Sequence, residues 1–413
     1  MKSQRNPMIP DQSQIVIIGG GVIGTSVAWH LGQLGLNDVV LLERGQLGCG
    51  TSWHAAGNVA SMDAQRSRTE ILRYSGELYA QFEQHDSIGY RRCGRVMPAR
   101  TRARMKEYES IAEVARTTGL NVELLQPHDV EERIPVMRVD DLVGGIWSAG
   151  DGRVNPTDLV SAYARGTREA GIRIVEDVNV DGVNIEHGRV SGVRTHEKVI
   201  RCDTVINCAG LWARPLGLAD GVNIPVYPIE DRYVLTDPIQ GVGTNMPTFR
   251  DPDSSIYGRE EVGGLLLGCF DKSAITISPD DLPSDFCFDL LNENWEHFSP
   301  YLEAGMHRFP ALHTAGIKTF LNGPESFTPD CLPVMGEVET ARGYFVLAGL
   351  CGLGIATSGG MGRALAHLIV EGDAGMEVAQ YAPSRFGTEQ NDEEWLRKRI
   401  PKVPGEGFTG GAE

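Results

Sequence analysis

Short runs of consecutive apolar residues alternate with segments whose apolar residues recur every three or four positions. Ile15 to Ile18 is such a run, and helix-like spacing over residues 22–34 and a second run at Val39 to Leu42 follow it. Continuous apolar runs rich in β-branched residues are typical of strands buried on both faces. Three- and four-residue spacing is typical of amphipathic helices. The N-terminal region therefore predicts one βαβ unit of a parallel sheet.

The pattern changes in the middle of the chain. Between about residues 224 and 322, Tyr233 to Leu235 and Leu265 to Leu267 predict strands of an antiparallel sheet. The polar, glycine-rich end from about Gly387 is expected to fray. Elsewhere we expect helices at about 69–84, 101–116, 156–170 and 356–370, and strands at 172–175, 178–180, 190–194, 205–208 and 344–348.

These patterns predict an α/β protein with two domains. The first is a Rossmann-like dinucleotide-binding domain, and the second is an α+β domain, discontinuous in sequence and built on an antiparallel sheet. A chain of 413 residues is long enough for two cores. We place the first domain at residues 14–90, 151–225 and 325–385, the second at 91–150 and 226–324, and a C-terminal tail at 386–413.

Charge and cysteine usage exclude several classes of partner. The net charge of −17 repels phosphate backbones and argues against nucleic acid. The eight cysteines form no C-x-x-C pair, which argues against a metal site and indicates thiols in a reducing compartment. No apolar run approaches roughly 18 residues, and the N-terminus lacks the apolar region of a signal peptide. We therefore expect a cytoplasmic protein without membrane insertion.

A glycine-rich turn follows the first strand. Gly19, Gly21 and Gly24 form a G-x-G-x-x-G motif that opens a helix, the arrangement that places a pyrophosphate at a helix N-terminus. Glu43 lies 19 residues after Gly24, at the end of the second strand, where a carboxylate can bind ribose hydroxyls. Glu43 and its neighbour Arg44 complete the predicted nucleotide site. The acidic side chain of Glu43 argues against a 2′-phosphate, and hence against NADP. The alternative is a glycine-rich turn beside a surface glutamate.

His54 stands in the small-residue segment Gly50-Thr51-Ser52-Trp53-His54-Ala55-Ala56-Gly57. A lone histidine beside a tryptophan is by default a packed or capping residue. Here it follows the ribose carboxylate by 11 residues, in a loop that could run along a flavin. A neutral imidazole nitrogen can bond to the 8α-methyl carbon of an oxidised flavin, which makes the flavin a stronger oxidant.

At these residues the chain resembles a known family. Residues 15–57 are similar to the flavin domain of dimethylglycine and sarcosine dehydrogenases, within the D-amino-acid-oxidase-like flavoproteins. The late segments Asn322-Gly323-Pro324, Thr328-Pro329-Asp330, Leu332-Pro333-Val334 and Gly349 to Gly360 extend the resemblance to nearly the whole chain. The resemblance implies that the first domain binds FAD and that His54 holds it covalently.

The resemblance also implies the roles of further residues. Tyr257 corresponds to an active-site tyrosine, and its hydroxyl could orient an amine or a carboxylate. The remaining cofactor contacts it implies are Thr51 and Ser52 at the pyrophosphate, Val178 at the adenine, Ala209 and Gly210 at the phosphates, and Gly352, Gly354 and Ile355 at the pyrimidine end of the flavin, where a helix N-terminus stabilises negative charge.

Three differences from the family bear on the reaction. The dimethylglycine enzymes have His-Gln-Tyr where this chain has Asp231-Arg232-Tyr233, which favours a more cationic substrate or another binding mode. Leu266 replaces the oxygen-activating lysine of related sarcosine oxidases, which favours another electron acceptor. The long relatives continue into a folate-binding domain, whereas this sequence ends at Glu413, so we expect release of formaldehyde or capture of the imine by another polypeptide.

Together these features predict an FAD-dependent enzyme that demethylates a small N-methylated amine or amino acid. Asp231, Tyr257 and Arg259 are the candidate catalytic residues; Arg259 and Arg232 could bind a substrate carboxylate, or could be surface ion pairs. The electron acceptor would be oxygen or an electron-transfer protein. The alternatives are an amino-acid or opine oxidase that releases a keto acid, a partner-dependent subunit of a larger oxidoreductase complex, and a nicotinamide-dependent dehydrogenase that would leave His54 unexplained.

Overall fold

A six-stranded sheet forms the first half of the architecture, and the computed structural model describes residues 8–409. The sheet is parallel except for one edge strand, β18. Its strands, in spatial order, are β18 (Val334–Glu337), β19 (Tyr344–Ala348), β12 (Thr204–Asn207), β1 (Ile15–Ile18), β2 (Val39–Leu42) and β8 (Arg173–Val175).

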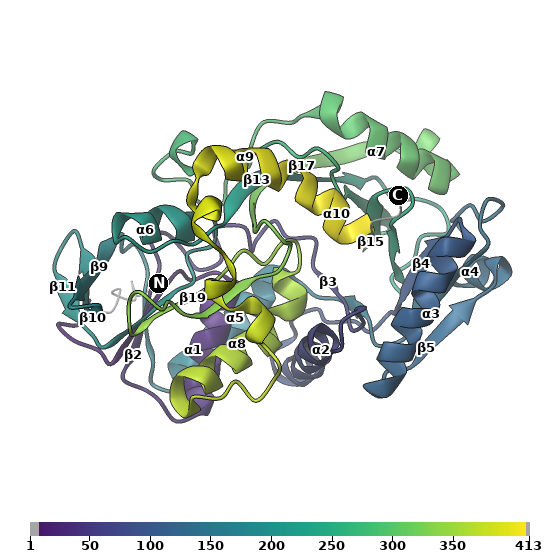
Figure 1. Cartoon of the computed structure of the whole chain (residues 1–413). Helices are drawn as coiled ribbons and strands as arrows, with labels where there is room; N and C mark the ends of the chain where they lie inside the picture. Colours follow the sequence, from purple (N-terminus) through teal and green to yellow (C-terminus); the bar gives the residue numbers. More distant parts are fainter. Residues whose placement is uncertain (1–7, 410–413) are drawn as a thin grey trace, which may run out of the picture.

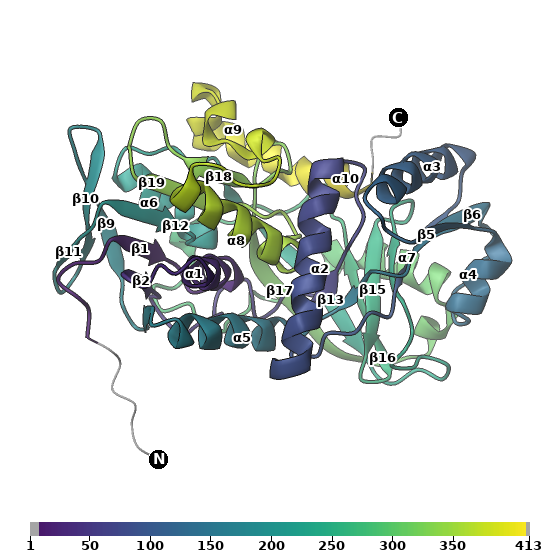
Figure 2. The same cartoon turned by 90° about the horizontal axis from the view of Figure 1, so that it is seen from below.

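Both faces of this sheet are covered, as its continuous apolar strands require. Ile15 and Ile17 pack toward the helices α1 (Val22–Gln33), α5 (Pro156–Glu169) and α8 (Gly354–Glu371). Val16 and Ile18 pack toward a three-stranded sheet of β9 (Val180–Glu186), β10 (Arg189–Thr195) and β11 (Val199–Arg201). Figure 2 shows α1, α5 and α8 grouped together, with the long helix α2 (Arg66–Asp86) beside them.

An eight-stranded sheet forms the second half. It is antiparallel except for the pair β4–β14. Its strands, in spatial order, are β17 (Ile317–Phe327), β13 (Tyr227–Thr236), β16 (Gly264–Cys269), β15 (Ile256–Glu261), β14 (Thr248–Asp251), β4 (Arg95–Ala99), β6 (Gly144–Ser148) and β5 (Val122–Leu125). A two-stranded pair, β3 (Asn58–Val59) and β7 (Gly152–Arg153), lies near the crossings between the halves.

Residues on the two faces of β16 have different neighbours. Leu265 and Leu267 pack in the core that holds α7 (Trp295–Arg308), and a side chain at Gly305 of this helix would collide with Leu267. Leu266 points to the opposite face, where it packs with Tyr233. Helices α3 (Arg102–Thr117) and α4 (Pro127–Arg133) cover the far end of the sheet. The prediction that the two middle runs are strands of an antiparallel sheet is confirmed, and the two strands pair directly, with Val234 opposite Leu267.

Two local expectations were wrong. Residues 178 and 179 precede β9 and form no strand, because the Val178 N–H is bonded to the Glu43 carbonyl instead of a sheet neighbour. The segment after Gly387 does not fray over its described part. It forms α9 (Glu393–Arg399) and α10 (Val403–Thr409), buries Leu396 and Phe408, and crosses to the large sheet (Figure 1).

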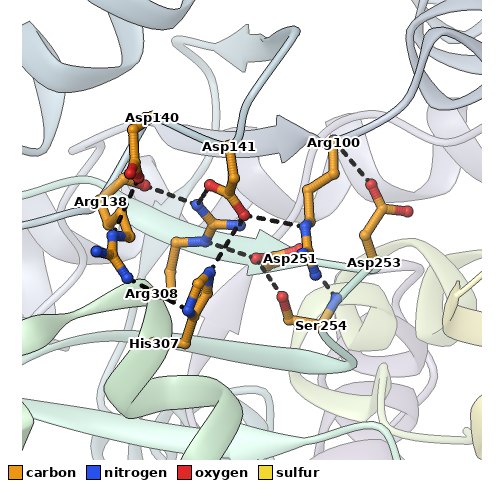
Figure 3. Close-up of polar contacts among 9 residues, drawn as sticks. All are labelled: Arg100, Arg138, Asp140, Asp141, Asp251, Asp253, Ser254, His307 and Arg308. Carbon is orange, nitrogen blue, oxygen red and sulfur yellow. Dashed lines mark hydrogen bonds and ion pairs between the residues drawn. The ribbon is translucent and has the colours of Figure 1, made fainter.

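A buried ion-pair network links the end of α7, the loop at Asp141 and the end of β14 (Figure 3). Arg308, at the end of α7, is fully buried and pairs with Asp251 at 2.8 Å and with Asp141 at 2.8 Å. Asp251 also accepts a hydrogen bond from the Ser254 hydroxyl at 2.8 Å. The network therefore fixes the end of β14. Among residues 8–409, no helix has the length and apolar character needed to cross a membrane.

Candidate functional site

One cavity brings residues of both sheets together. Its volume is about 440 Å³, and it extends from the carboxyl ends of β1 and β2 to the inner face of the large sheet. At one end it is lined by Gly19, Glu43 and Ala209, and at the other by Asp231 and Tyr257. The carboxyl ends of parallel strands are the usual place for a ligand in such a sheet.

The turn after β1 leaves no room for side chains. Gly19 has a φ of +107°, and a Cβ there would lie 2.4 Å from the Cys208 carbonyl oxygen. A Cβ at Gly24 would lie 1.9 Å from the Gly19 oxygen, so this glycine allows α1 to pack closely on the turn. The Ser52 hydroxyl accepts a hydrogen bond from the Val22 N–H at 2.9 Å. The loop that carries His54 is thereby held against the first turn of α1.

Glu43 is buried at the end of β2. Its Oε2 accepts a hydrogen bond from the Gly20 N–H at 2.6 Å, and its Oε1 accepts one from the Gly45 N–H at 2.9 Å. Burial raises the pKa of Glu43, although these two hydrogen bonds oppose the shift. Beside it, the Arg44 guanidinium lies 3.5 Å from the centre of the Trp212 ring. This end of the cavity therefore offers a carboxylate beside a stacked cation.

His54 is 5% exposed and lines the cavity. Its Nε2 is buried and has no hydrogen-bond partner among the described residues. Burial lowers the pKa of His54 to about 4, and a hydrogen bond to its own backbone opposes this only in part. The imidazole is therefore neutral at pH 7. Gly323 of β17 faces it so closely that a Cβ there would lie 2.4 Å from the His54 Cε1.

Asp231 and Glu325 form an acid pair on the cavity face of the large sheet. Asp231 lies opposite Gly323 in the β13–β17 ladder, so Glu325, two residues further along β17, shares its face. The two carboxyl groups are hydrogen-bonded to each other. Burial and the Asp231 charge raise the pKa of Glu325 well above its usual value, whereas the pKa of Asp231 is raised to about 6, chiefly by burial. At neutral pH the pair therefore carries one proton and one negative charge.

Glycines position the groups around this pair. The Gly352 N–H donates to Glu325 Oε1 at 2.9 Å, and Gly352 adopts a φ of +75° just before α8 begins at Gly354. On the next strands, the Tyr257 ring lies over Gly268, where a Cβ would be 2.3 Å from its Cζ. The open space at Gly268 therefore lets Tyr257 lean across the sheet within the cavity.

Known proteins similar to this chain show which family it belongs to. The model of the family described as FAD dependent oxidoreductase matches residues 14–368. This chain belongs to that family.

Its relatives include enzymes and a regulatory subunit. This chain is 37% identical to the mitochondrial pyruvate dehydrogenase phosphatase regulatory subunit of Mus musculus. It is 35% identical to the formaldehyde-forming 4-methylaminobutanoate oxidase of Paenarthrobacter nicotinovorans and 33% identical to the mitochondrial sarcosine dehydrogenase of Homo sapiens. Each match covers 95–96% of this chain. The matches cover 45%, 48% and 43% of those proteins, so the chain spans about half their length. The resemblance to sarcosine dehydrogenases is thus confirmed.

The predicted fold class is also confirmed by a solved structure. The L-proline dehydrogenase of P. horikoshii superposes with a TM-score of 0.83 at 24% identity, over 92% of this chain and 98% of the other. At this identity the likeness concerns the fold. It covers both the nucleotide-binding half and the large sheet, so the α/β arrangement with a second antiparallel sheet is shared.

The residues of this family member fit the family's cofactor, FAD. The tight glycine turn at the N-terminus of α1 can receive a pyrophosphate, and Glu43 can bind the ribose. His54, whose buried Nε2 has no hydrogen-bond partner among the described residues, lines the same cavity. The cavity is also lined by the other predicted contacts, Arg44, Thr51, Ser52, Val178, Ala209, Gly210, Gly352, Gly354 and Ile355. Gly24 lies behind the turn and acts through packing.

The structure corrects the role expected of two arginines. Arg259 does not line the cavity, because its Nε donates to the Ala56 carbonyl at 2.6 Å and its Nη1 pairs with Glu261. Arg232 is fully buried between Glu230 at 2.7 Å and Asp271 at 3.0 Å. Both guanidinium groups are therefore committed within the protein, and neither remains a candidate for binding a substrate carboxylate.

Glu325 and Arg250 are among the cavity-lining residues that sequence reasoning missed. Glu325 lies directly after the late segment Asn322-Gly323-Pro324, and its pairing with Asp231 depends on the register of β13 and β17. Arg250 lies in β14, a short strand that the apolar pattern did not reveal. The four residues of this strand include one apolar side chain, Phe249, so the hydrophobic pattern gave no signal for it.

Proposed function

We propose that this protein oxidises the C–N bond of a small N-methylated amine or amino acid with FAD as its cofactor. The observation that carries the proposal is the singly protonated Asp231–Glu325 pair, which shares a cavity with the nucleotide-binding turn and His54. The names of two relatives, a sarcosine dehydrogenase and a formaldehyde-forming methylaminobutanoate oxidase, support this substrate class.

The acid pair binds and deprotonates the amine in this proposal. Its single negative charge attracts a substrate ammonium, and Glu325 donates its proton to an Asp231 oxygen while its other oxygen is held by the Gly352 N–H. An Asp231 carboxylate oxygen then accepts the ammonium proton, which leaves the nitrogen lone pair free. Tyr257, on the same sheet face, orients the neutral amine.

The bound FAD supplies the acceptor for the hydride that leaves the carbon beside the nitrogen. Loss of that hydride from an N-methyl group produces an iminium ion, which water hydrolyses to formaldehyde and the demethylated amine. The iminium is either released to water or captured by a folate-binding polypeptide.

His54 is proposed to attach the FAD covalently. A neutral imidazole has a nucleophilic nitrogen, and burial keeps the pKa of His54 at about 4. Nε2 is the nitrogen without a partner, and the close approach of Gly323 fixes the ring against β17. For the other cofactor contacts we propose the roles that the resemblance implies. Val178 is more restricted, because its N–H donates to the Glu43 carbonyl, so its own carbonyl is the group left to contact the adenine.

The electron acceptor is proposed to be a molecule other than oxygen. Leu266 stands where related sarcosine oxidases have their oxygen-activating lysine. It is 1% exposed and packs with Tyr233 and Leu321, so an apolar cluster occupies this position. A dye or an electron-transfer protein should therefore reoxidise the enzyme faster than oxygen does.

A second candidate is a non-catalytic subunit of a larger complex. The observation that favours it is the 37% identity to a phosphatase regulatory subunit. Such a subunit would keep the nucleotide-binding turn but would not turn over N-methylated amines.

Anaerobic mixing of the FAD-loaded protein with N-methylated amines tests the two candidates. We expect bleaching of the oxidised flavin absorbance and one formaldehyde per flavin reduced in a single turnover. N-ethylated analogues serve as a control, because they cannot release formaldehyde. Bleaching with a keto acid as product would support the amino-acid oxidase instead. A flavin that no amine reduces would favour the regulatory subunit.

A further inference from the structure

Arg250 is a cation in the cavity wall that has no acidic partner within the described part of the chain. Among the described residues, no carboxylate lies within 4 Å of its guanidinium, and its buried Nε has no hydrogen-bond partner. Its Nη2 donates to the Phe408 carbonyl of α10. Of the other arginines that line the cavity, Arg95 pairs with Asp151 at 2.8 Å and Arg44 lies at the nucleotide end. Arg250 thus holds a charge that no carboxylate of residues 8–409 neutralises by a direct ion pair.

The apolar surroundings of Arg250 strengthen its interaction with an anion. Its guanidinium carbon lies 5.1 Å from the Phe270 ring centre and 5.3 Å from that of Phe408, and the two rings stack at 4.8 Å. Burial and the Arg95 charge lower the pKa of Arg250 to about 10, so the group stays protonated at pH 7. An anion that reaches it enters an apolar wall, where a charge-assisted hydrogen bond is stronger than in water.

Contacts on the opposite face of the sheet fix the position of Arg250. Successive residues of a strand point to opposite faces, so its neighbour Asp251 points away from the cavity. There Asp251 is held by Arg308 and Ser254, both at 2.8 Å (Figure 3). The end of β14 is therefore rigid, and the guanidinium is pre-positioned on the cavity side.

The sheet register separates Arg250 from the acid pair. Arg250 lies opposite Tyr257, Tyr257 opposite Gly268, and Gly268 opposite Tyr233, so the four share one face. Asp231, two residues before Tyr233, shares that face as well. Arg250 and Asp231 are three strand spacings apart, which corresponds to ~14 Å between the strand axes. Side chains that lean toward each other shorten this gap but do not close it.

An α-amino acid has one carbon between its nitrogen and its carboxylate, so it spans much less than this separation of the strands. We propose that Arg250 binds the carboxylate of a substrate whose N-methylated nitrogen lies at the Asp231–Glu325 pair, with a chain of several carbons between them. This inference rests on the proposed function and narrows its substrate to ω-(methylamino) carboxylates. Phe270 and Phe408 would then pack along the carbon chain.

The test compares substrates with and without the distant carboxylate. For the unchanged enzyme, we expect 4-(methylamino)butanoate to have a kcat/KM at least about 10-fold above that of N-methylglycine. Arg250→Met should lower kcat/KM for 4-(methylamino)butanoate by about 10- to 100-fold, as expected for one charge-assisted pair. The same variant should change kcat/KM for N-methylbutylamine, which has no carboxylate, by less than about 3-fold.

Arg133→Met is the matched control. Arg133 lies 5.1 Å from the Trp147 ring centre, like Arg250 beside Phe270, but is outside the cavity lining. It should leave both substrates unaffected. An equal loss of kcat/KM for the two substrates in Arg250→Met, or a preference of the unchanged enzyme for N-methylglycine, would overturn the inference.

A binding measurement separates this inference from the proposed function. Butanoate has no amine to oxidise, and titration calorimetry should show at least about 10-fold weaker binding to Arg250→Met than to the unchanged protein. Arg250→Lys, which keeps the charge, should recover part of that affinity and guards against a misfolded Met variant. If no amine is turned over but butanoate binding follows this order, the proposed function fails and the carboxylate site stands. Equal butanoate binding by all variants would refute the carboxylate site itself.

Discussion

At the scale of single residues, burial decides the chemistry of His54. Its imidazole is neutral at pH 7, and its Nε2 has no partner within the described part of the chain. We expect His54→Ala to bind FAD without a covalent bond. Acid precipitation should then leave the yellow colour in the supernatant, and mass spectrometry should find the polypeptide mass alone.

The control for this prediction is His128→Ala. The His128 side chain is 69% exposed, so its loss should leave the flavin in the acid pellet. Covalent flavin that persists in His54→Ala would place the attachment at another residue.

Asp231 predicts how activity depends on pH. Its pKa is raised to about 6, so below that pH the pair is neutral and does not attract an ammonium. For an amine that stays cationic, kcat/KM should therefore rise with pH through about 6 and then level off. Asp231→Asn should remove this rise and lower the plateau by about 10- to 100-fold, the loss expected for a charge-assisted pair.

Glu325→Gln is the informative comparison, because its amide still donates to Asp231. It should keep a rising limb, while Asp231→Asn should not. A limb near pH 6 that survives in Asp231→Asn would assign the titration to another group.

At the scale of elements, the close pairing of β15 and β16 positions Tyr257. A methyl group at Gly268 would lie 2.3 Å from the Tyr257 Cζ, so the ring would have to leave its place. We expect Gly268→Ala to lower kcat/KM by about 10-fold or more and stability by about 1–3 kcal/mol, the usual cost of overpacking. Steady-state kinetics and urea denaturation measure the two effects.

Gly243→Ala is the control, because a Cβ at Gly243 would meet nothing within 4 Å. Tyr257→Phe should reproduce the kinetic loss of Gly268→Ala without its loss of stability. If Gly268→Ala kept full activity, the placement of Tyr257 over this glycine would be refuted.

At the scale of the whole molecule, the fully buried Arg308 ties α7, the loop at Asp141 and β14 together. Arg308→Met would leave Asp251 buried and unpaired, which should cost about 3–5 kcal/mol of the free energy of unfolding. Chemical denaturation of the FAD-loaded protein measures it. Adding Asp251→Asn should restore part of the loss, because the two effects are coupled.

The exposed pair Arg66–Glu70 provides the comparison. Arg66→Gln should change stability by no more than about 0.5 kcal/mol. Equal effects of the two arginine substitutions would contradict the assigned importance of the buried network.

The sequence by itself determined the nucleotide-binding half. The strand, glycine turn and helix at residues 15–33 and the carboxylate Glu43 are local features, because each depends on apolar periodicity or on positions where only glycine fits. The small-residue loop with His54 was evident for the same reason. The antiparallel character of the middle segment also followed from short apolar runs.

Only the tertiary structure decided which charged side chains are available. Arg259 and Arg250 look alike in the sequence, but the fold gives Arg259 a carboxylate partner and leaves Arg250, in the cavity wall, without one among residues 8–409. Asp231 and Glu325 meet because of the register between β13 and β17, and Phe408 reaches Arg250 because the C-terminal segment folds back. The sequence determines which side chains carry a charge. The partners of each charge depend on contacts between residues far apart in the sequence, and these partners decide whether the charge can act on a ligand.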